Sequence, residues 1–210
     1  MDERKSIPVP AAARLCAVYR LLCDLSAQGV NFVSSGDLGE ALGIGAHNIR
    51  KDISHISGGG SGRSGYDTAR LKKQIAEHFG LENEYRACVT GLGRLGQALV
   101  RDGQHIFKEL KIVAAFDSDL NRVETIDVGV PVHPTYEITE TVKRLNIDTA
   151  ILTVPDPTAQ ECAERLITGG IKGIMNFTAT HLKVKGGVTV RNIDLAGEFK
   201  ILSALMFLGG

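Results

Sequence analysis

The stretch that decides the fold of this chain is Gly91-Leu92-Gly93-Arg94-Leu95-Gly96. It follows the apolar run Arg86–Thr90, which has strand character, and it leads into the helical pattern Leu95–Val100. In such a unit the first glycine permits a tight turn, the second lets the backbone approach a pyrophosphate, and the third lets the helix pack on the strand. The pyrophosphate then lies at the positive end of the helix dipole. The stretch therefore predicts a dinucleotide site in a Rossmann fold.

An acidic residue, Asp117, ends the next predicted strand, Lys111–Phe116. A carboxylate about 20 residues after the glycine turn accepts hydrogen bonds from the adenosine ribose and repels a 2′-phosphate. Asp117 is thus a predicted ribose ligand, and NAD(H) is favoured over NADP(H). Two other interpretations stay open, namely a glycine turn without a ligand and a site for another nucleotide-containing ligand such as coenzyme A.

Strands and helices alternate through the rest of the C-terminal part. The further strands are Thr149–Val154, Ile171–Phe177 and Val188–Ile193, and the helices between them are Ile138–Leu145 and Thr158–Thr168. This alternation predicts a doubly wound parallel sheet of the α/β class. Ligands bind at the carboxyl ends of such strands, so the candidate contacts are Thr153, Val154, Pro155 and Asn176. Strand-terminating turns explain these four residues equally well.

The N-terminal part has a helical period instead. A helix begins near Pro10, a second is capped by Ser34 with Asp37 three places on, and a third runs over Ala46–Ile56 after a glycine-containing turn. This spacing is typical of a helix-turn-helix. The glycine-rich segment Ser57–Gly65 then predicts a wing, and a fourth helix ends at Gly80. We expect a winged-helix DNA-binding domain over residues 1–80, a Rossmann domain over 81–193 and a terminal helix over 194–210.

The predicted third helix offers side chains that read DNA. The candidate DNA contacts are His47, Asn48, Arg50 and Lys51 for the major groove, and Arg63 in the wing for the minor groove. Between Ala46 and Lys73, six basic residues oppose two acidic ones, which is a surplus that attracts phosphates. A solvated helical face, or a four-helix module that binds a protein partner, fits the same pattern.

Composition narrows the class of protein. The chain has 210 residues, with 24 Lys and Arg against 24 Asp and Glu, and no apolar run approaches a membrane span. Its four cysteines form no CxxC pair, which disfavours a metal site or a disulfide framework and favours a cytoplasmic location. The two domains leave no room for a substrate domain, and no histidine stands in a catalytic arrangement. We therefore expect no enzyme; an NAD-dependent oxidoreductase with a helical protein-interaction domain is the alternative.

The end of the chain is unusually apolar. After Asp194, which has the position of a helix cap, the segment Leu195–Leu208 carries at helical spacing the apolar side chains Leu195, Phe199, Leu202, Leu205, Met206 and Leu208. So apolar a helix must pack on its own domain or on a partner.

These pieces, in this order, resemble the Rex family of redox-sensing repressors of bacteria over nearly the whole chain. The motifs that carry the resemblance are Tyr19-Arg20-Leu21, Ile49-Arg50-Lys51-Asp52-Ile53-Ser54, Gly65-Tyr66, the stretch Gly91–Gly96, Phe116-Asp117-Ser118-Asp119, Leu152-Thr153-Val154-Pro155, Asn176-Phe177 and Asn192-Ile193-Asp194-Leu195. The resemblance implies a homodimer on palindromic operator DNA that NADH releases and for which NAD⁺ competes. It also implies a terminal helix swapped between protomers.

The resemblance further assigns roles to single residues. Arg50 and Lys51 would contact DNA, the glycines would contact the pyrophosphate, and Asp117 would bind ribose. Arg20 and Asp194 would pair across the dimer as a switch. One difference bears on that switch: many members carry a tyrosine just after the first Rossmann helix, where this chain has Asp102.

Overall fold

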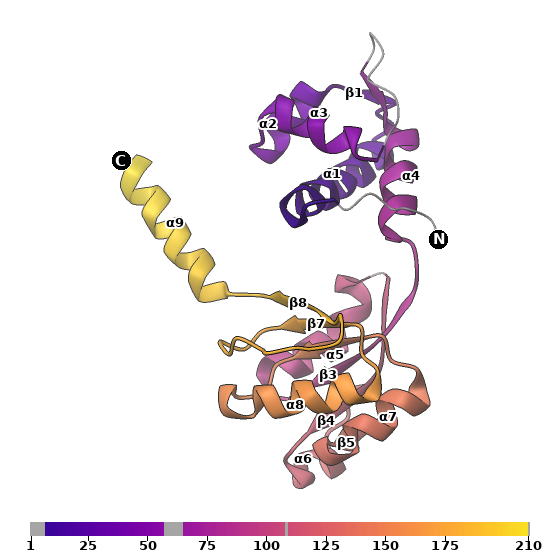
Figure 1. Cartoon of the computed structure of the whole chain (residues 1–210), viewed down its shortest axis with the longest axis vertical. Helices are drawn as coiled ribbons and strands as arrows, with labels where there is room; N and C mark the ends of the chain where they lie inside the picture. The colour runs from indigo at the N-terminus through magenta and orange to yellow at the C-terminus, as the bar shows by residue number, and fades with distance from the viewer. Residues whose placement is uncertain (1–6, 57–64, 108, 210) are drawn as a thin grey trace. The chain divides into compact units, whose positions relative to one another are not determined.

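The structure is a computed structural model of the chain, and it describes residues 7–56, 65–107 and 109–209 (Figure 1). Two compact units are present, Met1–Asn83 and Glu84–Gly210, and each is described by itself. The division falls after Asn83, slightly beyond the predicted boundary at residue 80, because Leu81 still packs against the core of the first unit.

The described residues of the first unit form four helices and a small sheet. In chain order its elements are α1 (Val9–Ala27), β1 (Phe32–Val33), α2 (Ser35–Leu42), α3 (Ala46–Ser54), β2 (Tyr66–Asp67) and α4 (Thr68–Phe79). At the start of α2, the Ser34 hydroxyl accepts the Asp37 N–H at 3.1 Å, and the Asp37 carboxylate accepts the Ser34 N–H at 3.0 Å. This capping box fixes where α2 begins. Gly43, at φ +64°, ends α2 and lets α3 follow at once.

One hydrophobic core joins these helices. It is formed by Leu15, Val18, Leu22, Val33, Leu38, Ile49, Ile53, Leu71 and Ile75. Strands β1 and β2 pair antiparallel, and they hold the segment that follows the predicted wing against the segment that precedes α2. Residues 57–64 of that wing, Arg63 among them, lie outside the described residues.

The second unit is a six-stranded parallel sheet with helices on both faces. Its strands are β3 (Tyr85–Thr90), β4 (Leu110–Asp117), β5 (Val132–Pro134), β6 (Thr149–Leu152), β7 (Gly173–Asn176) and β8 (Thr189–Asn192). Its helices are α5 (Arg94–Ile106), α6 (Leu120–Thr125), η1 (Thr135–Glu137), α7 (Ile138–Leu145), α8 (Asp156–Gly169) and α9 (Leu195–Gly209). The order β5-β4-β3-β6-β7-β8 is that of a Rossmann fold, and the strand order reverses between β3 and β6.

Two cores cover the two faces of this sheet. Helices α7 and α8 bury Val142, Cys162 and Leu166 on one face, with Phe116 and Leu152 from the strands. Helix α5 lies on the other face (Figure 1), where it buries Leu99 and Val100. The expected α/β class and Rossmann topology are thus confirmed.

Several details differ from the sequence prediction, since helix α6 and the short helix η1 were not expected. Strand β5 was not expected, because its three residues follow Pro131 and end at Pro134, which leaves no apolar alternation to detect. Helix α5 continues to Ile106 rather than ending at Val100, so Asp102 lies inside the helix and not after it. Gly103 permits this extension, because a Cβ there would meet the Ile112 side chain at 2.5 Å.

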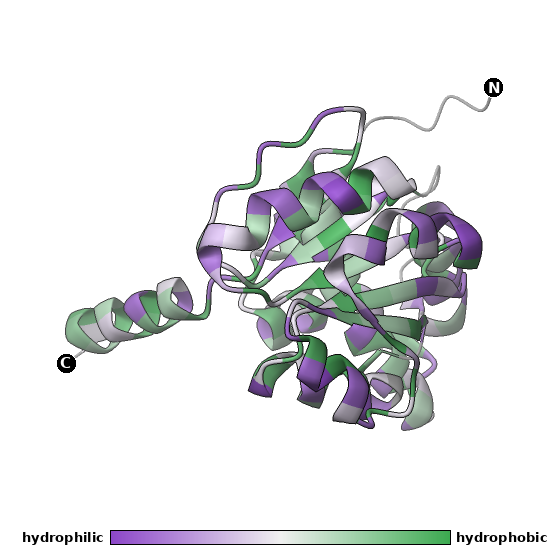
Figure 2. Cartoon of the chain, turned by 90° about the horizontal axis from the view of Figure 1, so that it is seen from below, coloured by the Kyte–Doolittle hydropathy of each residue, from purple (hydrophilic) through white to green (hydrophobic). Residues whose placement is uncertain are grey.

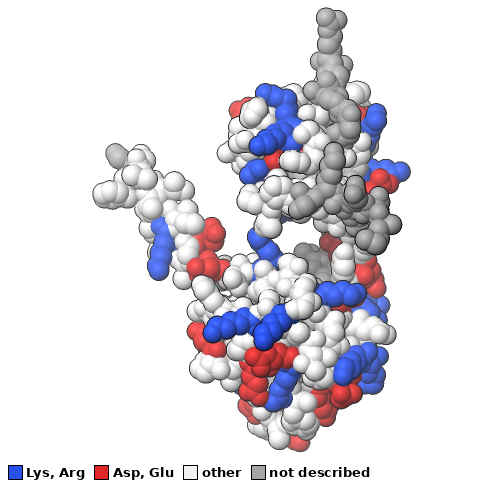
Figure 3. All heavy atoms as spheres, viewed as in Figure 1, with Lys and Arg blue, Asp and Glu red and all other residues white. Residues whose placement is uncertain are grey.

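Helix α9 buries none of its residues within the chain. Its large apolar side chains are more than half exposed, from 52% for Leu202 to 87% for Phe207. Figure 2 shows hydrophobic colour along most of this helix, and Figure 3 shows its outer end without charged side chains. No helix among the described residues is both long and apolar enough to cross a membrane.

Candidate functional site

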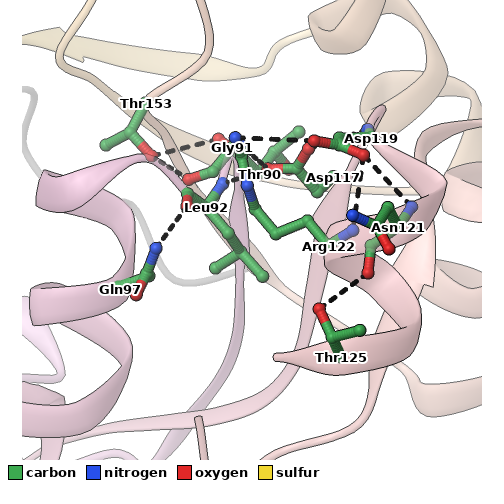
Figure 4. Close-up of polar contacts among 10 residues, drawn as sticks. All are labelled: Thr90, Gly91, Leu92, Gln97, Asp117, Asp119, Asn121, Arg122, Thr125 and Thr153. Carbon is green, nitrogen blue, oxygen red and sulfur yellow. Dashed lines mark hydrogen bonds and ion pairs between the residues drawn. The ribbon is translucent and has the colours of Figure 1, made fainter. Parts of the chain in front are cut away.

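The turn after β3 is held in shape from two sides. Gly91 adopts φ +96°, and its N–H donates to the Phe116 carbonyl at 2.7 Å. The Thr153 hydroxyl donates to the carbonyls of Thr90, at 3.1 Å, and Gly91, at 2.8 Å. The Gln97 amide donates to the Leu92 carbonyl at 2.8 Å (Figure 4). The turn is therefore rigid where the strand order reverses.

The three glycines of the turn have different reasons to be glycine. A Cβ on Gly91 would come within 2.8 Å of the Thr153 carbonyl, and one on Gly96 would collide with the Gly91 carbonyl oxygen. A Cβ on Gly93 would have nothing within 4 Å, and the φ of Gly93 is an ordinary −65°. The fold requires Gly91 and Gly96, whereas Gly93 leaves bare backbone beside open space at the start of α5. That is the cradle a pyrophosphate needs.

A cavity of about 590 Å³ borders this turn, and we call it the Asp117 pocket. It is lined by Gly91, Gly93, Asp117, Ser118, Asp119, Arg122, Thr135, Thr153, Val154, Pro155, Thr158, Glu161, Cys162 and Arg165. Its volume is in the range of sites for small molecules and cofactors, about 300–1,000 Å³. Three of the predicted contacts at the end of β6, Thr153, Val154 and Pro155, thus lie in this wall.

Asp117 lies in the Asp117 pocket with only 4% of its surface exposed. Its Oδ2 accepts the Leu92 N–H at 2.7 Å, and its Oδ1 accepts the Asp119 N–H at 2.9 Å. The Arg122 guanidinium approaches Oδ2 at 3.1 Å, as Figure 4 shows. The carboxylate is therefore fixed in position before a ligand arrives, and Leu92 contributes its backbone while its side chain is buried.

A second cavity of about 290 Å³ borders the same helix start, and we call it the Asp194 pocket. It is lined by Leu95, Phe177, Thr178, Ala179, His181, Asn192, Ile193, Asp194, Leu195 and Ala196. The Asp117 pocket and the Asp194 pocket thus both border the segment between Gly91 and Leu95. Two pockets on one glycine turn fit a ligand with two halves joined by a pyrophosphate.

Asn176 requires a correction, because the structure gives it no accessible surface. Its amide nitrogen donates to the Thr180 carbonyl and to the Asn192 side chain, both at 2.9 Å. Its amide oxygen accepts the Thr178 N–H at 3.0 Å and the Thr178 hydroxyl at 2.8 Å. Asn176 therefore positions the loop that lines the Asp194 pocket and does not itself reach a ligand there.

The two predicted switch residues lie in different units. Asp194 caps α9, and its Oδ1 accepts the Gly197 N–H at 2.8 Å. Arg20 is exposed on α1. Asp194 thus belongs at once to a pocket wall and to the first turn of the apolar helix α9.

Helix α3 presents the predicted DNA-reading side chains to solvent. His47, Asn48, Arg50 and Lys51 are exposed, while Ile49, Asp52 and Ile53 are buried. The Arg50 guanidinium donates to the Ser35 hydroxyl at 2.9 Å, which links α3 to the start of α2. Beneath them, Arg14 of α1 forms a bidentate pair with Asp52, at 2.6 Å and 2.9 Å. This pair holds α3 against α1.

Several residues of the pockets were not predicted from the sequence. These are Arg122, Thr135, Thr158, Glu161, Cys162 and Arg165 in the Asp117 pocket, and Thr178 and Asn192 in the Asp194 pocket. Only Arg122 carried a sequence signal, since an arginine near the ribose site is the feature by which some dinucleotide sites accommodate a 2′-phosphate. Within residues 7–56, 65–107 and 109–209, no group of three metal-ligating side chains comes together.

Comparison with known proteins places both units in one family. A model described as a CoA binding domain matches residues 82–180, and one described as a putative DNA-binding protein N-terminus matches residues 6–54. The redox-sensing transcriptional repressor Rex of Leuconostoc citreum (strain KM20) is 37% identical over 202 residues, which cover 96% of this chain and 94% of that protein. The protein of the same name from Ligilactobacillus salivarius (strain UCC118) is 36% identical, with 93% and 92% covered.

Solved structures agree. The chain is similar to RSP, described as a Rex-family repressor, with 27% identity and a TM-score of 0.86 over 98% of this chain and 100% of that one. It is also similar to RSP in complex with beta-NAD+ and operator DNA, with 28% identity and a TM-score of 0.87 over 96% and 93%. RSP in complex with beta-NADH gives 28% identity and a TM-score of 0.85 over 95% and 94%.

Proposed function

The chain belongs to the Rex family of redox-sensing transcriptional repressors, and we propose that it binds operator DNA through α3 and loses that DNA when NADH fills the site at Gly91–Gly96. Family membership confirms the prediction of a repressor rather than an enzyme. The relatives solved with NAD⁺ and operator DNA, and with NADH, name the two ligands.

One observation carries the nucleotide part of the proposal, namely the open space at Gly93. A side chain there would touch nothing in the protein, so this glycine serves a ligand rather than the fold. The fixed carboxylate of Asp117 supplies the ribose acceptor, and the first turn of α5 supplies the positive end of a helix. A bound NADH would be held by these groups, and its nicotinamide would supply the difference in charge from NAD⁺ that makes the site redox-sensitive.

The homodimer forms the second part of the proposal. Leu195, Phe199, Leu202, Leu205 and Leu208 are all more than half exposed, which a lone protomer in water does not favour. A second copy that receives α9 would bury this surface. The dimer would present two α3 helices to a palindromic operator. A cytoplasmic location fits the four cysteines, which form no disulfide.

The test measures operator affinity by fluorescence anisotropy with no nucleotide, with NADH and with NAD⁺. Allosteric couplings are typically about 1–3 kcal/mol, so NADH should weaken DNA binding at least about fivefold. Gly93→Ala is the matched variant, because it leaves the fold and α3 intact and fills only the cradle. It should bind the operator as the wild type does, but respond less to NADH. Equal wild-type affinity in all three conditions would refute the redox-sensing function.

A further inference from the structure

We propose that the preference for NAD(H) over NADP(H) is set by the pair Asp117–Arg122, in which Arg122 is a specificity residue that offsets the charge of Asp117. The proposal rests on the nucleotide site proposed above. It differs from assigning Asp117 alone, because it makes the selectivity of the wild type moderate and makes Arg122 the group that receives a 2′-phosphate once Asp117 is neutral.

The geometry places three charges in one wall of the Asp117 pocket. Arg122 Nη1 lies 3.1 Å from Asp117 Oδ2, and Arg122 Nη2 lies 3.6 Å from Asp119 Oδ2. The Asp117 side chain is 5% exposed, whereas 40% of the Arg122 side chain and 49% of the Asp119 side chain are exposed. Figure 4 shows Arg122 reaching from α6 toward both carboxylates. The guanidinium thus lies beside the ribose acceptor with part of its surface open to the pocket.

The hydrogen bonds of Asp117 explain why Arg122 takes part in recognition. An ionised carboxylate has about four acceptor positions. Three donors already reach Asp117, namely the N–H groups of Leu92 and Asp119 and the Arg122 guanidinium. A ribose hydroxyl therefore finds one acceptor position on Asp117, next to a cation with free donor capacity. The ribose end of the pocket is a charge pair rather than an isolated anion.

A 2′-phosphate meets this pair differently from a hydroxyl. Such a phosphate carries about −1.5 to −2 charges near neutral pH, so Asp117 repels it while Arg122 attracts it. Arginine is the side chain that binds phosphate in two-point geometry. Removing Arg122 leaves the repulsion by Asp117 and Asp119 uncompensated, and removing the charge of Asp117 leaves Arg122 opposed by Asp119 alone. The two single changes must therefore shift the preference in opposite directions.

A second arginine in the same pocket provides a matched control. Arg165 of α8 also lines the Asp117 pocket, but its guanidinium donates to the Thr135 carbonyl at 3.0 Å and to Glu161 at 2.6 Å. Replacing Arg165 removes one positive charge from the pocket without touching the ribose acceptor. The Arg165 variant therefore distinguishes an effect of the position of Arg122 from an effect of the total charge of the pocket.

The experiment measures the Kd of NADH and of NADPH by fluorescence titration for the full-length wild type, Asp117→Ser, Arg122→Ala and the double variant. The readout is the ratio of the two Kd values, in which losses common to both nucleotides cancel. A hydrogen bond to a charged group changes affinity roughly ten- to a hundredfold, and partial exposure favours the lower end. Arg122→Ala should raise the ratio of the NADPH Kd to the NADH Kd about tenfold. Asp117→Ser should lower it by a similar factor.

The double variant decides the proposal. It should lose the gain in NADPH affinity seen in Asp117→Ser, while Arg165→Ala in the same background should keep it. An equal gain with and without Arg122 overturns the proposal, and so does an unchanged ratio in Arg122→Ala. Asp117→Asn serves if Asp117→Ser does not fold. A wild type that binds neither nucleotide refutes the proposed nucleotide site itself, so the two failures are distinguishable.

Discussion

The partly buried pair between Arg14 and Asp52 allows a quantitative prediction about the DNA-binding unit. Asp52 lies on α3, the helix that carries the predicted DNA contacts, and its side chain is 3% exposed, while that of Arg14 is 34% exposed. Hydrogen bonds from Arg14 to Asp52 raise the pKa of the guanidinium above its usual value. The two partners therefore differ in what each leaves behind when the other is removed.

Asp52→Ala removes two charge-assisted hydrogen bonds, but it leaves Arg14 able to reach water. The expected loss is about 2 kcal/mol of the free energy of unfolding, at the lower end for hydrogen bonds to charged groups. For a unit of this size the loss lowers Tm by roughly 10 °C. Arg14→Ala instead leaves a buried carboxylate without its charged partner, which is the costlier way to break a buried pair. We expect Arg14→Ala to be the more destabilising of the two.

The assay is urea denaturation of the full chain, followed by circular dichroism at pH 7, together with operator binding below the transition. The exposed pair Lys73–Glu77 on α4 provides the control, since Glu77→Ala should change stability by no more than about 0.5 kcal/mol. The operator affinity should fall in the Arg14 and Asp52 variants, because both remove the ion pair that holds α3 against α1. The reasoning would be refuted if Asp52→Ala were at least as destabilising as Arg14→Ala. It would also be refuted if neither variant lost more stability than Glu77→Ala.

Three further predictions concern the second unit. Deleting residues 195–210 should abolish the dimer and weaken operator binding; a truncated chain that sediments as a dimer would contradict the role proposed for α9. The pKa of Asp148 is lowered chiefly by its hydrogen bond from Lys172, so its contribution is present above the unfolded pKa of about 3.9 and is lost as pH falls through the folded value. Lys172→Ala should therefore destabilise the protein more at pH 6 than at pH 3, and an equal loss at both would argue against it. Burial raises the pKa of Cys88 to about 12, so iodoacetamide at pH 8 should label Cys88 only after unfolding; mass spectrometry showing rapid labelling of Cys88 itself in the folded chain would exclude this.

The sequence predicted best where one local rule determines the backbone. The capping box at Ser34 and the glycine turn at Gly91 each depend on residues a few places apart, and the structure has both. The rule fails for β5, whose three residues owe their strand geometry to pairing with β4 rather than to any pattern of their own. It fails also for α5, whose last turn packs Gly103 against the Ile112 side chain of the following strand β4, a tertiary contact that the helical pattern does not show.

Side-chain roles were harder to predict than backbone positions. Asn176 does end a strand beside a pocket, as expected, but only its hydrogen bonds to Thr180 and Asn192 show that its amide is already used. The Arg122 side chain turns back toward Asp117, and a sequence pattern does not give that direction. Positions at strand ends are thus predictable from alternation, whereas the saturation of a polar group depends on the assembled loops.

The last prediction concerns how nucleotide binding is coupled to DNA binding elsewhere in the protein. The Asp194 pocket includes the first turn of α9, so a ligand that fills it contacts the start of the helix that we propose to be buried in a second copy. Asp194→Asn tests this link cleanly, because asparagine caps a helix about as well as aspartate and only the charge is lost. NADH should still bind at the intact glycine turn, while its effect on operator affinity should shrink if the charge of Asp194 pairs with Arg20 of the partner. By linkage, the operator must then lower NADH affinity by the same reduced factor. Asp194→Asn with the full wild-type response, measured by anisotropy in both directions, would remove this aspartate from the switch.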